Sequence, residues 1–157
     1  MGVEIERKYL VNSKAYRAKA QRAYRIIQGF LNKDPHRTVR VRLLDDRGIL
    51  TVKGLSSEDG TTRFEWETNL TKQEAQSLLQ LCEKGIIDKT RYEIPLGAYM
   101  FEVDEFHGAN GGLIVAEIEL PQVSTMVELP EWIGEEVTGD HRYYNSSLSK
   151  TPYGSWF

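Results

Sequence analysis

Cysteine is almost missing from this sequence, since Cys82 is the single cysteine among 157 residues. One cysteine cannot form an intramolecular disulfide or a cysteine-rich metal cluster, so nothing requires an oxidising compartment. The sequence also lacks the run of about 18 apolar residues that a membrane helix needs. Its first residues are charged and do not form an apolar leader segment. These absences predict a soluble, cytoplasmic protein without a cleaved leader or a membrane anchor.

An excess of positive charge is absent as well. The formal net charge is −3, whereas a general nucleic-acid-binding protein shows a basic excess on one face. Long charge blocks and low-complexity tracts are missing too, and the length suits one folded domain spanning residues 1–157. We therefore expect a single domain that does not bind nucleic acid, in which any phosphate site must be locally basic.

Common ligand motifs are missing from the chain. There is no glycine-rich loop ending in Lys-Ser or Lys-Thr, so a strand-loop-helix phosphate site is unsupported. The three histidines, His36, His107 and His141, are not spaced as zinc ligands. If this protein binds phosphate or metal, other side chains must do so.

Alternation of charged and apolar residues is what the sequence does contain. Successive side chains of a strand point to opposite faces, so in residues 3–11 one face carries Glu4, Glu6 and Lys8. Similar segments recur, and eight strands are expected at residues 3–11, 24–31, 38–44, 49–54, 61–69, 86–94, 99–106 and 113–120. A helix is expected after the cap residue Thr71 and before Gly85, because Thr71 and Glu74 make a capping-box pattern. The fold class is therefore mainly β with a few flanking helices.

A charged strand face has an ordinary explanation, which is a half-exposed sheet in water. Recurrence favours a different one, because the charged faces here are dominated by arginine and by carboxylate doublets. Eight antiparallel strands can close into a barrel that holds one small ligand. We therefore predict an eight-stranded antiparallel closed β-barrel, a tunnel with a charged interior.

Two sets of side chains would face that interior. The acidic set offers hard oxygen ligands suited to Mg²⁺ or Mn²⁺ and comprises Glu4, Glu6, Glu65, Glu67, Glu102, Asp104, Glu117 and Glu119. The basic set offers hydrogen-bond donors to phosphate and comprises Lys8, Arg40, Arg42, Lys53, Arg63, Lys89 and Arg91. Metal-assisted phosphoryl chemistry needs metal cations bound by carboxylates on one side and phosphate groups bound by basic residues on the other.

This ordered set resembles the CYTH superfamily, the triphosphate tunnel metalloenzymes. The motif at the N-terminus is Glu4-x-Glu6-x-Lys8, and the match continues to the ending around Tyr144-Asn145. Further matching segments are Arg40-x-Arg42, Leu50-Thr51-Val52-Lys53, Arg63-x-Glu65-x-Glu67, Lys89-Thr90-Arg91-Tyr92, Glu102-x-Asp104 and Glu117-x-Glu119. The resemblance covers nearly the whole chain and implies a tunnel that binds a triphosphate with a divalent metal.

Within that family the opening resembles bacterial inorganic triphosphatases, which implies hydrolysis of inorganic triphosphate to pyrophosphate and phosphate. The residues implied to hold metal are Glu4, Glu6, Asp104, Glu117 and Glu119, while Glu65, Glu67 and Glu102 bind metal or form ion pairs. The implied phosphate ligands are Lys8, Arg40, Arg42, Lys53, Arg63, Lys89 and Arg91, and the implied catalytic residues are Lys8, Glu4 and Glu6.

Alternatives remain open at this point. The reaction could be hydrolysis of ATP or thiamine triphosphate, or cyclisation of a nucleotide as in class IV adenylyl cyclases. A non-catalytic polyphosphate-binding module is a third possibility. The expected partner is a small-molecule triphosphate, and the chain is expected to be a monomer or a homodimer.

Overall fold

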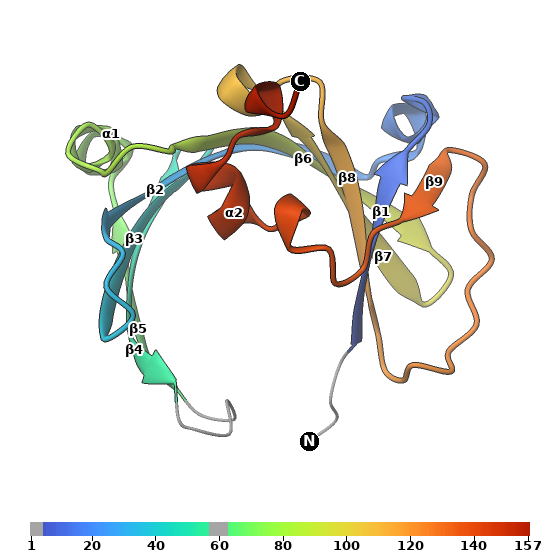
Figure 1. Cartoon of the computed structure of the whole chain (residues 1–157), viewed down its shortest axis with the longest axis horizontal. Coiled ribbons are helices and arrows are strands. Elements are labelled where there is room, and N and C mark those ends of the chain that lie inside the picture. Colours follow the sequence, from blue (N-terminus) through green and yellow to red (C-terminus); the bar gives the residue numbers. More distant parts are fainter. Residues whose placement is uncertain (1–4, 57–62) are drawn as a thin grey trace. The chain divides into compact units, whose positions relative to one another are not determined.

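The computed structural model describes residues 5–56 and 63–157 (Figure 1). Its strands are β1 (Ile5–Val11), β2 (Arg22–Asn32), β3 (Arg37–Leu44), β4 (Arg47–Ser56), β5 (Arg63–Leu70), β6 (Ile87–Leu96), β7 (Tyr99–Phe106), β8 (Ile114–Leu120) and β9 (Ile133–Glu136). Its α-helices are α1 (Lys72–Leu79) and α2 (Asn145–Lys150), and its 3-10 helices are η1 (Ala15–Lys19), η2 (Gly108–Asn110), η3 (His141–Tyr143) and η4 (Tyr153–Ser155). The mainly β class is confirmed.

The prediction of a closed eight-stranded barrel is wrong in two respects. Hydrogen bonds join nine strands in the order β5-β4-β3-β2-β6-β7-β8-β1-β9. This order begins at β5 and ends at β9, so within the described ranges hydrogen bonds do not close the sheet. Alternation assigns each side chain to a face, but it does not say which edges pair. The extra strand, β9, is too short to show alternation and pairs with the edge of β1 (Figure 1).

Contacts group the chain into two compact units. The first contains the described residues up to Tyr24 together with Lys89–Phe157, and the second contains Arg25–Asp88. Each unit has its own hydrophobic cluster on one sheet face. The expectation of a single domain stays a prediction.

The apolar face of the first unit is built from alternate residues of antiparallel strands. In β1, β7 and β8 the residues Tyr9, Phe101 and Ile118 are buried on this face. Tyr16 of η1 and Trp132 cover them, and the Trp132 ring packs edge-on against Tyr16 at 5.6 Å and Phe101 at 5.4 Å between centroids. Because the apolar side chains of these strands point into this core, the residues that alternate with them lie on the opposite face of the sheet.

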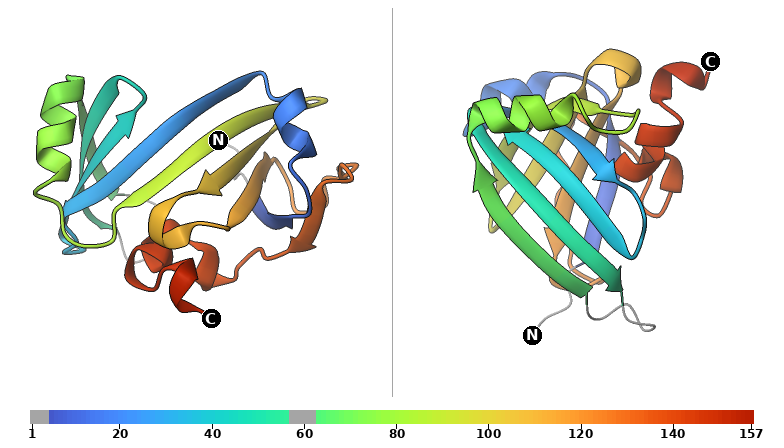
Figure 2. Two further views of the ribbon diagram at one scale, coloured as in Figure 1. Left: turned by 90° about the horizontal axis from the view of Figure 1, so that it is seen from above. Right: turned by 90° about the vertical axis from the view of Figure 1, so that its left-hand side faces the viewer.

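The second unit repeats this arrangement with a helix as its cover. The turn residues 45–48 between two predicted strands indicate a hairpin, and strands β3 and β4 form it. Helix α1 packs against β3, β4 and β5 (Figure 2). Thr71 and Glu74 make both hydrogen bonds of the predicted capping box, so the start of α1 is confirmed. Val41, Leu43 and Ala75 form the buried centre of the cluster between helix and sheet. The alternate residues, among them Arg40, Arg42, Thr51 and Glu67, lie on the other face.

Two details near the helices differ from expectation. The sequence predicts a helix that begins after a cap at Asn12 or Ser13 and extends to about Arg22, because its alanines favour helix. Only the 3-10 helix η1 forms, since the apolar face is thin and Tyr16 is the one buried residue of η1. The sequence also predicts that Asn145 caps a brief last helix, but Asn145 is the first residue of α2, and Tyr144 occupies the cap position without a side-chain hydrogen bond. The Asn145 side chain points to Lys89 instead, with 3.5 Å between Oδ1 and Nζ.

A partly buried ion pair fixes η1 to the edge of the core. Glu105 of β7 accepts hydrogen bonds from the Tyr16 hydroxyl and from Nε of Arg17 at 2.7 Å. The hydrogen bonds from Arg17, with a smaller contribution from Tyr16, lower the pKa of Glu105 below its ordinary value of 4.5. A carboxylate with a lowered folded-state pKa stabilises the fold above the unfolded pKa and loses this effect as the pH falls through the folded pKa.

We predict that Glu105→Gln lowers the melting temperature at neutral pH by a few degrees, at roughly 2–4 °C per kcal/mol for a chain of this size. The difference from wild type should shrink as the pH falls below 4.5, because protonation of Glu105 removes the same charge. Melting curves at several pH values test this, with the exposed Glu131→Gln as control. A difference that stayed constant down to about pH 3 would contradict the assignment.

Candidate functional site

The polar face of the first unit gathers charges from four strands. The cross-strand pairs on this face are Glu6 with Glu119, Lys8 with Glu117, Glu102 with Glu117, and Arg91 with Asp104. Because directly opposite residues in an antiparallel pair have neighbouring side chains, these charges are brought together by register. The alternation of charged and apolar residues in the sequence thus places these charged side chains together on one face of the sheet.

Lys8 lies at the centre of one ion-paired group. Its ammonium is 2.9 Å from Oε1 of Glu117 and 4.7 Å from the centre of the Tyr144 ring. Its backbone N–H donates to Oγ1 of Thr138 at 3.0 Å. The C-terminal segment therefore reaches the polar face at Lys8, and a cation that is nearly buried is held by a carboxylate and an aromatic ring.

Asp104 forms the second group with Lys89 and Arg91. Its carboxylate accepts hydrogen bonds from Nε and Nη2 of Arg91 at 2.7 and 2.9 Å, and from Nζ of Lys89 at 2.9 Å. Burial alone would raise the pKa of Asp104, but the two cations lower it to about 2. Burial lowers the pKa of Arg91, but the hydrogen bonds that Arg91 donates to Asp104 hold this pKa above its ordinary value. Asp104 and Arg91 are therefore both charged at neutral pH.

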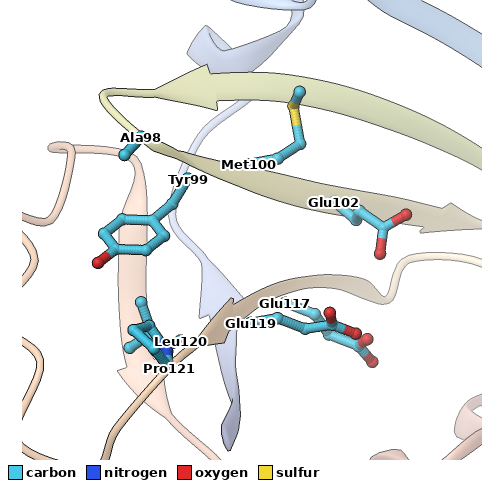
Figure 3. Close-up of a pocket in the computed structure, with 8 residues that line it drawn as sticks. All are labelled: Ala98, Tyr99, Met100, Glu102, Glu117, Glu119, Leu120 and Pro121. Carbon is cyan, nitrogen blue, oxygen red and sulfur yellow. The ribbon is translucent and has the colours of Figure 1, made fainter. Parts of the chain in front are cut away.

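A cavity of about 510 Å³ opens beside these groups. Figure 3 shows the carboxylates of Glu102, Glu117 and Glu119 at one end and Tyr99 and Leu120 at the other. Partial burial, then the charges of Glu117 and Glu102, raise the pKa of the nearby Glu6 despite the opposing effect of Lys8. Four carboxylates thus crowd one region, and a bound cation would relieve their repulsion.

The donor chemistry of this region fits a hard divalent cation, since carboxylate oxygens are the ligands that Mg²⁺ and Mn²⁺ prefer. The arrangement is not a ready-made metal site. In the described part of the chain, no three His, Cys, Asp or Glu side chains are placed so that they could hold a metal ion together. The carboxylates would have to adjust their rotamers around the ion.

The second unit has a polar face of its own. Nε of Arg42 donates to Oε1 of Gln28 at 3.1 Å, and Oγ1 of Thr51 donates to Glu67 at 2.8 Å. Nε of Arg40 is buried and has no hydrogen-bond partner within residues 5–56 and 63–157. Burial lowers the pKa of Arg40, against the opposing effect of the charges of Glu67 and Glu65. An incompletely satisfied buried guanidinium suits the binding of an anion.

The predicted site residues fall on these two faces. The face of the first unit carries Glu6, Lys8, Lys89, Arg91, Glu102, Asp104, Glu117 and Glu119. The face of the second carries Arg40, Arg42, Lys53, Glu65 and Glu67. Glu4 is not among the residues that the structure describes. Arg63 is the first residue of β5, but its side chain is not described. Their roles as ligands stay predictions.

Several residues of these faces are not predicted from sequence. Gln28 occupies a polar-face position of β2 opposite Arg42, and its place in the alternation of residues 24–31 is the signal that identifies it. Tyr144 and Asn145 reach Lys8 and Lys89 from the C-terminal segment. That segment has no periodic pattern, so their contacts follow only from the tertiary fold.

Comparison with known proteins bears on this geometry. Residues 2–154 match the CYTH domain. This chain belongs to the CYTH family. A relative named inorganic triphosphatase, from Acetivibrio thermocellus, is 48% identical over 155 residues, which cover 98% of this chain and 97% of that protein. A second inorganic triphosphatase, from Nitrosomonas europaea, is 34% identical over 150 residues, covering 93% and 96%.

Solved structures agree with the fold of this CYTH chain. A crystal structure of an inorganic triphosphatase matches with a TM-score of 0.76 and 29% identity, covering 95% of each chain. A putative adenylyl cyclase from Hippeastrum, described as having a dominant triphosphatase activity, matches with a TM-score of 0.52 and 16% identity, covering 76% of this chain and 80% of that one. The second likeness concerns the fold alone. No helix among the described residues is long and apolar enough to cross a membrane.

We predict that Arg40→Met leaves the ligand-free protein as stable as before or more stable, because it removes a buried guanidinium whose Nε lacks a partner. The rise in melting temperature caused by tripolyphosphate should become smaller. Melting curves with and without tripolyphosphate test both effects. The control is Arg37→Met, since Arg37 is exposed. An unchanged ligand-induced rise would show that Arg40 does not bind the anion.

Proposed function

We propose that this CYTH protein hydrolyses inorganic triphosphate to pyrophosphate and orthophosphate with the help of a divalent cation. The observation that carries the proposal is the polar face of the first unit, where Lys8 and Arg91 lie beside the carboxylates around one cavity. The inorganic triphosphatase of Acetivibrio thermocellus, 48% identical over nearly the full length of both chains, supports it.

The basic residues are proposed to bind the phosphate groups. Arginine and lysine N–H groups donate charge-assisted hydrogen bonds to phosphate oxygens. The proposed ligands are Lys8, Arg40, Arg42, Lys53, Arg63 and Arg91. Lys89 has the same predicted role, but its ammonium is fully buried against Asp104, so any phosphate contact would require a rearrangement.

The acidic residues are proposed to hold the cation. The proposed metal ligands are the carboxylates of Glu4, Glu6, Glu117 and Glu119. Glu102 lines the same cavity as Glu117 and Glu119. When bound, Mg²⁺ or Mn²⁺ would neutralise phosphate oxygens and act as a Lewis acid. Glu65 and Glu67 remain proposed as ion-pair partners or metal ligands, and Asp104 is treated below.

In the proposed reaction water attacks a terminal phosphorus and the bond to the bridging oxygen breaks. Negative charge then develops on the pyrophosphate leaving group. Lys8 and Arg91 are held by Glu117 and Asp104, so their remaining N–H groups have fixed directions in which to stabilise that charge. Placing charged donors before the reaction avoids their reorganisation during it.

The proposal is tested by phosphate release from tripolyphosphate, ATP and thiamine triphosphate in parallel, with Mg²⁺, Mn²⁺ or a chelator. We expect metal-dependent release from tripolyphosphate and much less from the other two. Faster turnover of ATP or thiamine triphosphate would favour those alternatives, and cyclic nucleotide from ATP would indicate a cyclase. Binding without turnover of any substrate would leave a non-catalytic polyphosphate-binding module. Cytoplasmic location and a monomeric or homodimeric state stay predictions.

A matched substitution tests the metal assignment. Glu119→Gln keeps the size of an exposed side chain but removes its anionic oxygen, so the fold should survive. We predict that metal binding weakens and that turnover falls by about a hundredfold, because metal-ion catalysis is worth several kcal/mol. Glu131→Gln, exposed and outside this face, is the control for activity and metal titration. Wild-type turnover in Glu119→Gln would remove Glu119 from the metal site.

A further inference from the structure

Asp104 differs from the other acidic residues of the polar face in how completely its carboxylate is used. Oδ1 accepts from Nε of Arg91 at 2.7 Å, and Oδ2 accepts from Nη2 of Arg91 and Nζ of Lys89, both at 2.9 Å. The Asp104 side chain is 7% exposed. Of the roughly four lone-pair positions of this carboxylate, three already accept hydrogen bonds from cations, so a metal ion would bind beside two positive charges and compete with donors that are well placed.

The surroundings of Lys89 explain why this group is a fixed part of the structure. Its side chain is 0% exposed, and its ammonium lies 5.6 Å from the centre of the Phe106 ring. A buried ammonium is tolerated only when it is paired, and Asp104 supplies the negative charge. Without Asp104, two neighbouring cations would face each other in a region with little solvent.

The guanidinium of Arg91 has two ends with different partners. Its Nε–Nη2 edge is held by Asp104, whereas Nη1 lies 3.2 Å from Oε2 of Glu102, which lines the cavity. Because the guanidinium is planar, fixing one edge with two parallel hydrogen bonds also fixes the direction of the other. Asp104 therefore determines where the Nη1 end of Arg91 points.

The acidic residues of this face also differ in whether they line the cavity. Glu102, Glu117 and Glu119 line the cavity, and Asp104 is not among its lining residues. Glu117 also pairs with a cation, but through one contact from Lys8 and with more exposure, 19%. Among the described acidic residues of this polar face, Asp104 alone combines two paired oxygens with a position away from the cavity.

We propose that Asp104 is a positioning residue, not a metal ligand: with buried Lys89 as a second partner, it orients the Nη1 end of Arg91 toward the phosphate groups of the substrate. This inference rests on the proposed function for the identity of the substrate. It replaces the metal-binding role expected for Asp104 from sequence.

The first experiment observes Arg91 directly. In a ¹H–¹⁵N spectrum, the Nε–H signal of Arg91, assigned with Arg91→Lys, should be sharp because a buried carboxylate accepts this hydrogen bond. In Asp104→Asn the signal should shift and broaden, and in Lys89→Met it should persist because Asp104 still holds Arg91. If Asp104→Asn does not fold, the combined Asp104→Leu and Lys89→Met variant replaces the ion pair with apolar groups and should lose the signal. An unchanged signal without the Asp104 carboxylate would overturn the proposal.

The second experiment separates positioning from metal binding without using activity. Mn²⁺ binding is measured by electron paramagnetic resonance of the free ion for wild type, Asp104→Asn and Glu119→Gln. We expect Asp104→Asn to bind Mn²⁺ with nearly wild-type affinity, whereas Glu119→Gln weakens binding by about tenfold or more, as loss of a ligand does. A loss in Asp104→Asn equal to that in Glu119→Gln would make Asp104 a metal ligand and overturn the proposal.

Kinetics complete the test. In Asp104→Asn the kcat for tripolyphosphate should fall on the order of tenfold to a hundredfold at saturating metal, because a misplaced guanidinium no longer meets the developing charge. A wild-type kcat and KM would overturn the positioning role. If wild type itself released no phosphate, the proposed function would fail, whereas the spectra and Mn²⁺ binding would still decide how Asp104 acts.

Discussion

Charge pairing between antiparallel neighbours is the constraint on which the polar faces depend. Removing a carboxylate or ammonium from water costs several kcal/mol unless a partner compensates, so the buried charges of Lys8 and Asp104 depend on the partners that the strand register supplies. The register places Lys8 opposite Glu117 and Arg91 opposite Asp104. A shift of one residue would turn these side chains to the apolar face and expose the core around Phe101.

The same constraint divides the acidic residues by role. Both oxygens of Asp104 are paired with Lys89 and Arg91, which is the basis for proposing it as a positioning residue. Glu117 and Glu119 line a cavity with a surplus of negative charge, which raises the pKa of Glu6 and favours a bound cation. The proposed roles in phosphate binding, metal binding and positioning thus fall to residues of similar type but different pairing, which residue type alone does not distinguish.

Much of this architecture follows from period-two alternation, and its gaps have physical causes. The positions of β3 and β8, the polar faces and the cap of α1 are predicted because each depends on local sequence. The strand β9 and the open order of the sheet are not, because edge pairing is a tertiary property. The pairing of Asp104, on which its proposed positioning role rests, could not be predicted for the same reason, since its partners lie on another strand and become neighbours only once the register is known.

The most direct test of this account is a crystal structure with Mn²⁺ and a non-hydrolysable tripolyphosphate analogue, in which anomalous scattering locates the metal. The account predicts Mn²⁺ bound to carboxylates that line the cavity, among them Glu119, a phosphate oxygen in contact with Nη1 of Arg91, and Asp104 still paired with Lys89 and Arg91. Mn²⁺ coordinated by Asp104, or an analogue bound away from the polar face, would contradict it.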